Sequence, residues 1–410
     1  MNEFVIIGNG VAAVGCIEGI RAAGGEGPIT VVSAENHPVY SRPLISYYLE
    51  GRTDRARMQY READFYEKNG CSVLYGVTAE RIDPAAKRVF LSDGSVLPYA
   101  KLCVATGSSP FVPPTEGLEQ VAHKFTFLTL DDALALEGAV TKQSRVLVVG
   151  AGLIGLKCVE GILNRVQSVT VCDLADRVLS SILDADCAGI VQQHLEAHGV
   201  RIMLQDRVVR FSPDAATFQS GQVVPFDVLV TAVGVRPNTA LLKPFDGAVN
   251  RGILVNTRTQ TTLSDVYAAG DCAEGFDSSI GRNRVLALLP NAYRMGYTAG
   301  TNMAGGARED DRAIPMNSIG FFGLHIMTAG AYQGTMTEQR TDGAIRRFYT
   351  EDGLLKGFIL IGDTERAGIY TALIRNRTPL DSIDFGAMKK IASSLYFSSE
   401  TRRKNFGGIV

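Results

Sequence analysis

The hydrophobic positions of this chain fall into short runs of four or five residues, separated by glycine-rich or polar segments. Two of these runs, at residues 4–7 and 145–149, are each followed by a glycine-rich turn and then a stretch with helical spacing. A second run follows each of them, at residues 29–32 and 169–172. Short runs that are almost entirely apolar are typical of parallel strands buried on both faces. The pattern therefore predicts one strand–turn–helix–strand unit, used twice.

Both turns have the spacing of a dinucleotide-binding loop. The spaced positions are Gly8, Gly10 and Ala13 in the first unit and Gly150, Gly152 and Gly155 in the second. In such a loop the first glycine permits a tight turn and the second lets the backbone approach a pyrophosphate. The third position must be small so that helix and strand pack closely. The free N–H groups and partial positive charge at the start of the helix then favour phosphate.

An acidic residue follows the second strand of each unit, Glu35 in the first and Asp173 in the second. A carboxylate at this place can accept hydrogen bonds from ribose hydroxyls. A single glycine motif is weak evidence, because glycine-rich turns are common. Two copies in the same context favour two nucleotide sites over two glycine turns without a ligand.

Three further apolar strands end in small residues, where backbone can pass close to a ligand. The segments that follow them are Ala105-Thr106-Gly107, Ala232-Val233-Gly234 and Ala269-Gly270-Asp271. Asp271 is expected at a strand end near the start of another helix. Taken alone, it would be interpreted as a helix N-cap rather than as a ligand contact.

These five motifs, in this order, resemble the pyridine nucleotide–disulfide oxidoreductase superfamily. The resemblance implies an α/β fold with two doubly wound Rossmann-like nucleotide-binding domains and a small α+β C-terminal domain. Its implied boundaries are residues 1–112 and 239–311 for an FAD domain and 113–238 for an NAD(P)H domain. Residues 312–410 would form the C-terminal domain, usually a homodimer interface, and the apolar alternation at residues 355–361 suggests a small mixed sheet there.

The resemblance also implies a role for each motif residue. Gly8, Gly10 and Ala13 would hold the FAD pyrophosphate, and Glu35 would hold the adenosine ribose. Ala105, Thr106 and Gly107 would lie along the FAD, and Asp271 would bind its ribityl chain. Gly150, Gly152 and Gly155 would hold the NADH pyrophosphate, Asp173 its ribose, and Gly234 would approach the nicotinamide nucleotide. The run 174–176 supplies no cation for a 2′-phosphate, so NADH is expected over NADPH.

The segment at residues 35–49 resembles the rubredoxin-reductase and nitrite-reductase branch, which carries a similar Tyr-x-Arg-Pro run over the flavin. Arg42 in this run would contact a phosphate or the flavin. The chain departs from many relatives at one position. They carry a glutamate soon after the second glycine motif, near the nicotinamide, and Lys157 inverts the charge here.

The cysteines give no sign of a redox pair, a disulfide framework or a zinc site. They are seven in number, with no short pair spacing, and none falls in residues 36–70, where the disulfide-reducing and peroxidase relatives carry theirs. Buried thiols are expected instead. His194 and His198 lie four apart on a probable helix but lack a third ligand, so a solvated helix face is expected and no metal.

Composition narrows the class of protein. A chain of 410 residues suggests two to three domains at about 150 residues each. The formal net charge of −2 offers no basic field for nucleic acid. No apolar run approaches the roughly 20 residues that cross a bilayer, and the start lacks the basic residues of a secretory signal. A cytoplasmic protein is expected.

The expected activity is a flavin-centred transfer of hydride from NADH to FAD, with no redox cysteine and no general base. The expected electron acceptor is a small one-electron carrier, rubredoxin or another iron–sulfur protein. The basic run Arg402-Arg403-Lys404 is either a solvated tail or a docking patch for such a carrier. Two alternatives stay open, an NADH oxidase or peroxidase that reduces oxygen species and a flavin-binding subunit of a larger complex.

Overall fold

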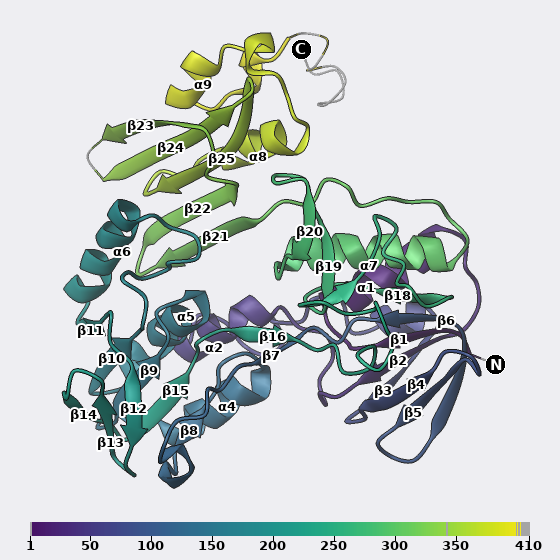
Figure 1. Cartoon of the computed structure of the whole chain (residues 1–410), viewed down its shortest axis with the longest axis horizontal. Coiled ribbons are helices and arrows are strands. Elements are labelled where there is room, and N and C mark those ends of the chain that lie inside the picture. The colour runs from purple at the N-terminus through teal and green to yellow at the C-terminus, as the bar shows by residue number, and fades with distance from the viewer. Residues whose placement is uncertain (1, 342, 399, 401, 403–410) are drawn as a thin grey trace.

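The computed structural model describes residues 2–341, 343–398, 400 and 402, and Figure 1 shows their arrangement. Two parallel sheets lie in the lower part of the view, each with helices packed on it, and an antiparallel C-terminal sheet lies above them. This is the expected α/β architecture, and the strands and helices of both predicted units lie within two residues of their expected positions.

The first sheet has the strand order β3-β2-β1-β6-β5-β4, with β18 also paired to β6. Strands β1, β2, β3, β6 and β18 run parallel, and β4 and β5 form an antiparallel extension. The bounds are β1 Asn2–Ile7, β2 Ile29–Ser33, β3 Cys71–Tyr75, β4 Ala79–Asp83, β5 Arg88–Leu91, β6 Val96–Val104 and β18 Val266–Ala268.

Helix α1 (Val11–Ala22) follows β1 and packs along its length on α7 (Leu289–Met303). Glycines make this close contact, since a Cβ on Gly296 would overlap the carbonyl of Ala12 and one on Gly300 the carbonyl of Cys16. The first nucleotide unit is thus completed by a helix from far along the chain.

The second sheet, β11-β10-β9-β15-β8, is parallel throughout. Its strands are β8 Lys124–Phe125, β9 Arg145–Val149, β10 Ser168–Cys172, β11 Val200–Met203 and β15 Val228–Thr231, and its helices are α4 Leu130–Ala139, α5 Leu153–Ile162 and α6 Ala185–Ala197. A small antiparallel sheet of β12 Val208–Phe211, β13 Ala215–Phe218 and β14 Val223–Pro225 lies beside it.

A two-stranded ribbon joins the two parallel sheets. The chain leaves the first sheet through β7 (Ser108–Pro110) and returns through β16 (Val235–Pro237), and these strands pair antiparallel. Between β2 and β3 lie η1 (Arg42–Leu44), α2 (Ile45–Glu50) and α3 (Phe65–Lys68), and η2 (Leu118–Gln120) and η3 (Leu163–Arg165) are short turns. A third small sheet holds β17 Ile253–Leu254, β19 Ala273–Asp277 and β20 Arg282–Val285.

The C-terminal sheet has the order β21-β22-β25-β24-β23, and every pairing in it is antiparallel. The expectation of a mixed sheet is therefore wrong, because short hairpin turns connect β21 to β22, β23 to β24 and β24 to β25 and leave no crossover for a parallel pair. The elements are β21 Met316–Phe321, β22 Leu324–Gly330, β23 Thr335–Thr341, β24 Ala344–Glu351, β25 Leu354–Ile361, α8 Ala367–Arg375, η4 Leu380–Ser382, α9 Phe385–Lys390 and η5 Ser394–Tyr396.

One hydrophobic core joins helix α2 to the second parallel sheet and to the C-terminal sheet. It contains Leu49 from α2, Val159 from α5 and Phe321 from β21, all fully buried. The C-terminal sheet is thus packed directly against the helices of the second parallel sheet. Within the described part of the chain, none of the helices has the length and apolar character that crossing a bilayer requires.

Candidate functional site

The two glycine loops have the same geometry. Gly8 has a φ of +108° and Gly150 a φ of +119°, a region that side chains rarely adopt. A Cβ on Gly8 would overlap the carbonyl of Ala105, and one on Gly150 would overlap the carbonyl of Ala232. Each loop is thus pressed against the end of the neighbouring strand, which is where the sequence places the segments 105–107 and 232–234.

The helices that follow these loops begin with free N–H groups. Gly10 is the N-cap of α1 and Gly152 that of α5, and neither helix has a side-chain cap or an acid in its first turn. By contrast, α4 begins with a capping box of Thr129 and Asp132. A Cβ on Gly10 or Gly152 would meet no atom within 4 Å, so open space lies in front of both helices. This arrangement fits the pyrophosphate of a dinucleotide.

The residue at the third position of each loop is tightly packed. Ala13 is completely buried, and a Cβ on Gly155 would overlap the carbonyl of Gly150. Small residues at both positions therefore let each helix lie directly on its strand.

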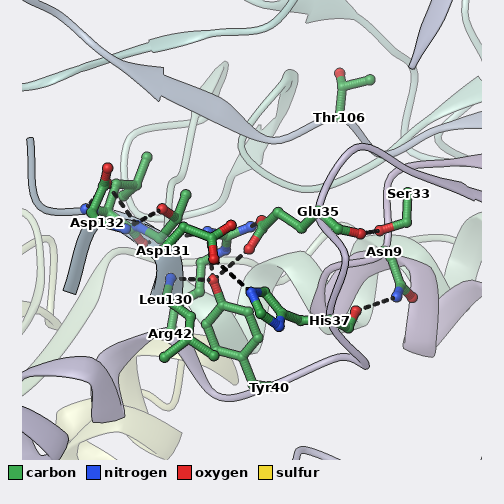
Figure 2. A network of polar contacts seen from close by, with 12 residues as sticks. Asn9, Ser33, Glu35, His37, Tyr40, Arg42, Thr106, Leu130, Asp131 and Asp132 are labelled. Atoms are coloured by element: carbon green, nitrogen blue, oxygen red, sulfur yellow. Dashed lines mark hydrogen bonds and ion pairs between the residues drawn. The ribbon is translucent and has the colours of Figure 1, made fainter. Parts of the chain in front are cut away.

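Glu35 belongs to a polar network that Figure 2 shows from close by. The Tyr40 hydroxyl donates to Glu35 Oε2 at 2.6 Å, and the Arg42 guanidinium pairs with Glu35 Oε1. Arg42 also donates to the carbonyl of Leu128 at 3.3 Å, and its side chain stays 41% exposed. Each Glu35 oxygen keeps a lone pair for a ribose hydroxyl, so the network fits the adenosine end of a flavin nucleotide.

The same network connects the first sheet to the start of α4. The Leu130 N–H donates to the Tyr40 hydroxyl at 2.8 Å, and His37 Nε2 lies 2.7 Å from Asp131 Oδ1. Tyr40 is the first residue of the Tyr-x-Arg-Pro run, but the run alone does not indicate that its hydroxyl bonds both Glu35 and Leu130. Its partner on α4 comes from 90 residues further along the chain, which no local pattern reveals.

Asp173 is held in place by two backbone amides. The Ala151 N–H donates to Asp173 Oδ2 at 2.7 Å and the Ala175 N–H to Oδ1 at 2.8 Å. The carboxylate therefore lies beside the second glycine loop, as its expected ribose contact requires. The run 174–176 ends one residue before Arg177, a nearby cation whose guanidinium pairs with Asp176 at 2.7 Å.

The strand ends of the two units are brought together by the β7–β16 ribbon. The Phe111 N–H donates to the carbonyl of Gly234 and the Asn238 N–H to that of Gly107, both at 2.9 Å. The Thr106 hydroxyl donates to the carbonyl of Asn238 at 2.8 Å, and the Asn238 amide donates to that of Thr106 at 2.8 Å. Asn238, missed in the sequence, thus fixes the edge that both candidate sites share.

Asp271 lies in a turn between β18 and β19, so the N-cap alternative does not apply, because the chain continues into a strand. The helices near it are α1 and α7, since a Cβ on Gly270 would lie 3.0 Å from the Cβ of Ala12 and 3.6 Å from that of Ala292. Burial raises the pKa of Asp271, and the positive charge of Arg42 opposes this effect.

The cysteines of the structure are free thiols, six buried and Cys71 half-buried. Burial raises the pKa of Cys71 and that of Cys272, each to about 11, so neither is a thiolate at neutral pH. Among the described residues, no group of three or more His, Cys, Asp or Glu side chains is arranged to hold a metal.

The expectation of a solvated face at His194 and His198 holds for His198, which is exposed, but not for His194, which is half-buried. His194 Nε2 lies 3.0 Å from the carbonyl of Phe321, and His198 stacks on the Phe322 ring at 4.7 Å. Both histidines contact the C-terminal sheet, whose position above α6 the sequence of the helix cannot indicate. Of the basic run at 402–404, only Arg402 is among the described residues.

Comparisons with known proteins agree with this geometry. A family model described as pyridine nucleotide-disulphide oxidoreductase matches residues 2–296. The NADH-dependent phenylglyoxylate dehydrogenase subunit epsilon of Aromatoleum evansii is 33% identical over 392 residues, with 92% of each chain covered. A nitrite reductase of Bacillus subtilis is 31% identical over 367 residues, covering 88% of this chain and 44% of that protein.

Solved structures show the same fold along nearly the whole chain. The covalent putidaredoxin reductase–putidaredoxin complex matches with a TM-score of 0.88 at 24% identity, covering 96% of this chain and 97% of that one. Fdr9 matches with a TM-score of 0.80 at 26% identity, covering 93% and 97%. With the family model and the relatives pointing the same way, the chain belongs to the pyridine nucleotide-disulphide oxidoreductase family.

Proposed function

We propose that this protein is an FAD-dependent NADH oxidoreductase that works without a redox-active cysteine pair. The observation that carries the proposal is the repeated loop geometry, in which Gly8 and Gly150 are pressed against two strand ends in front of two uncapped helices. Two dinucleotides can be held in this way, and the β7–β16 ribbon brings their sites to a shared edge.

In this proposal the residues bind and align, and the cofactor does the chemistry. A bound flavin accepts hydride from a nicotinamide without needing a general base from the protein. The N–H groups at the start of α1 would hold the FAD pyrophosphate, Glu35 its ribose and Asp271 its ribityl chain. The N–H groups at the start of α5 would hold the NADH pyrophosphate, and Asp173 its ribose. Fixing both nucleotides aligns the reacting rings and removes the entropic cost of bringing them together.

The remaining motif residues would support the binding of the two nucleotides. Ala13 and Gly155 would allow the close helix packing, and Arg42 would contact a flavin phosphate. Ala105, Thr106 and Gly107 would lie along the FAD, with Gly234 beside the nicotinamide nucleotide. The implied division into residues 1–112 with 239–311, 113–238 and 312–410 is part of the proposal, as are a cytoplasmic location and a homodimer formed through the last segment.

For the electron acceptor we propose a small one-electron carrier. The nitric oxide reductase FlRd-NAD(+) reductase of Aeromonas hydrophila, which is named for a reaction between FlRd and NAD(+), is 33% identical over 278 residues. The free thiols have no place in this transfer, because burial keeps those with raised pKa values protonated. An NADH oxidase of Methanocaldococcus jannaschii, 31% identical over 313 residues, favours oxygen as the alternative acceptor.

The test is an anaerobic titration of the purified protein with NADH, followed by stopped-flow oxidation with rubredoxin or with oxygen. We expect noncovalent FAD and an endpoint of two electrons per flavin. An endpoint of four electrons would reveal a redox disulfide and contradict the mechanism. Reoxidation by oxygen as fast as by rubredoxin at equal concentration would replace the carrier with the oxidase alternative.

A second candidate function is that of a flavin-binding subunit in a larger enzyme. The relative from Aromatoleum evansii that matches over 92% of both chains is named as a subunit of a dehydrogenase. Purification of the tagged chain from its native host separates the two candidates. A stable assembly with other chains, together with weak reduction of free rubredoxin, would favour the subunit.

A further inference from the structure

Lys157 is a half-buried cation that takes no part in the nucleotide contacts described above. It lies in the second turn of α5, and its side chain is only 18% exposed. Its Nζ pairs with Glu160 and donates to the carbonyl of Gly320 at 3.3 Å. The same ammonium lies 4.4 Å from the centre of the Tyr47 ring, within the range of a cation–π interaction. Its position is therefore fixed from several sides.

The partners of Lys157 come from three separate parts of the chain. Tyr47 belongs to α2 of the first half, Glu160 to α5 itself, and Gly320 to β21 of the C-terminal sheet. The Phe322 N–H donates to the other oxygen of Glu160 at 2.9 Å, which holds this carboxylate as well. The ion pair thus has a defined place relative to α2, α5 and the C-terminal sheet.

This place is the surface where the two nucleotide-binding halves touch. Helix α2 packs against α5, and Gly161 allows the contact, because a Cβ there would lie 2.9 Å from the carbonyl of Ser46. The chain reaches α2 directly from Arg42, whose charge interacts with that of Asp271. Hydride transfer requires the two reacting atoms to lie about 3–3.5 Å apart. In the proposed function, the nicotinamide held through α5 would therefore meet the flavin near this surface.

A fixed cation beside this surface has a defined electrostatic effect. Hydride transfer adds negative charge to the flavin, and a nearby positive charge favours the more negative state. Glu160 offsets part of the Lys157 field. Removing the lysine charge and removing the glutamate charge must therefore shift the flavin in opposite directions.

We propose that Lys157 raises the reduction potential of the bound flavin, its ammonium being held against Tyr47 by Glu160 and the Gly320 carbonyl. The inference rests on the proposed FAD-dependent function and deepens it. Lys157 acts here as a positioning residue through its charge, and it exchanges no proton or electron itself.

The experiment measures the two-electron potential of the flavin in the holoenzyme, together with flavin content and thermal stability. The variants are Lys157→Met, Glu160→Gln and, as a control, Lys142→Met, which removes an exposed lysine from the same half. In Lys157→Met we expect the ratio of reduced to oxidised flavin at a fixed potential to fall about tenfold, or ~30 mV for a two-electron couple. In Glu160→Gln we expect this ratio of reduced to oxidised flavin to rise, and in Lys142→Met we expect it to change by less than about twofold.

Three outcomes would overturn the inference. The first is a lower melting temperature in both variants with an unchanged flavin potential, which would make the pair purely structural. The second is a shift of the same sign in both, which would report loosened packing. The third is wild-type protein without FAD, which contradicts the proposed function and is visible before any potential is measured. If the Lys157→Met variant does not retain its flavin, the Lys157→Arg variant is measured in its place. A wild-type flavin potential in Lys157→Arg, together with a raised flavin potential in Glu160→Gln, supports the inference.

Discussion

The two acidic residues Asp173 and Asp271 have opposite surroundings, although both are assigned to sugar hydroxyls. Two backbone N–H groups donate to the Asp173 carboxylate and fix its position. Asp271 is buried, and burial raises its pKa in spite of the nearby Arg42. The Asp173 carboxylate thus has its hydrogen-bond partners before any ligand binds. The charge on Asp271, by contrast, destabilises the folded protein, and hydrogen bonds from a ligand can offset this cost.

The first prediction concerns the variant Asp271→Asn. A raised carboxyl pKa means that the ionised group destabilises the fold at pH values above it, so removing the charge should not lower the stability of the apoprotein. The affinity for FAD should fall about ten- to hundredfold, because a charge-assisted hydrogen bond contributes roughly 1.5–3 kcal/mol. Thermal melting of the apoprotein and flavin titration measure the two effects. A less stable apoprotein would contradict the assignment.

The second prediction is that kcat/KM is about ten- to hundredfold higher for NADH than for NADPH, and that Asp173→Ala lowers this ratio. A 2′-phosphate would meet like charge at Asp173, and the Arg177 guanidinium is already paired with Asp176. Steady-state kinetics with both nucleotides provide the measurement. Asp206→Ala is the control, because the Asp206 carboxylate accepts a hydrogen bond from the Ser220 hydroxyl and not from the glycine loop. Equal values in the wild-type protein would refute the prediction.

At the scale of single residues, the sequence predicts the positions that a repeated motif defines and misses those that depend on distant partners. Gly8, Gly150 and Asp173 lie where their spacing requires. Asn238 and Glu160 stand in no motif, and their roles arise only because β16 returns beside β7 and β21 packs on α5.

At the scale of elements, the start of α4 is attached to the first half of the molecule. Its capping box satisfies the Asp132 N–H, and the Leu130 N–H is satisfied by the hydroxyl of Tyr40. The two halves are therefore held together by a hydrogen bond at a helix terminus as well as by the apolar contact of α2 with α5.

The third prediction follows from this attachment. Tyr40→Phe leaves the buried Leu130 N–H without a partner and should lower the free energy of unfolding by about 1–3 kcal/mol. It also removes the hydrogen bond to Glu35, so the flavin should bind more weakly. Urea unfolding of Tyr40→Phe is compared with that of Tyr60→Phe, because the Tyr60 hydroxyl makes no such bond between the halves. Equal losses in both variants would show that the Tyr40 hydroxyl does not hold α4.

The sequence predicts a strand well where the strand is buried on both faces. The strands β1, β9 and β15 are buried on both faces, and their apolar runs cannot be mistaken for exposed elements. The direction of the C-terminal strands was predicted less well, because the alternation in residues 355–361 indicates a strand without indicating its partner. The hairpins that set the direction depend on short turns such as the one at Gly353.

At the scale of the whole molecule, an arginine connects the C-terminal sheet to the second parallel sheet. Arg347 on β24 is 8% exposed and contacts Asp184 at 2.6 Å, Asp186, and Glu338 at 2.6 Å. Hydrogen bonds from Arg340 and Arg347 lower the pKa of Asp186 and that of Glu338. The contact between the sheets therefore depends on carboxylates being ionised.

The fourth prediction is a dependence of stability on pH. Carboxyl groups with lowered pKa values stabilise the fold above their ordinary pKa of about 4, and this contribution is lost as the pH falls through the folded values. The melting temperature should drop below about pH 4. Arg347→Met should weaken this pH dependence and lower the free energy of unfolding at pH 7 by about 1–3 kcal/mol, because the carboxylates lose a hydrogen-bond partner. Arg210→Met, which breaks an exposed pair with Glu116, is the control, and an equally small effect of Arg347→Met would contradict the prediction.

The packing of α1 on α7 has a consequence for the order in which the protein matures on the ribosome. The Cys16 thiol contacts the Met303 sulfur, 287 positions further along the chain. The second parallel sheet, by contrast, is complete once Val228–Thr231 has emerged. Because domains fold as units during translation, we expect the middle of the nascent chain to become protease-resistant first. FAD can be captured only after α7 emerges, so ribosome-bound chains that stop near residue 240 should take up no flavin.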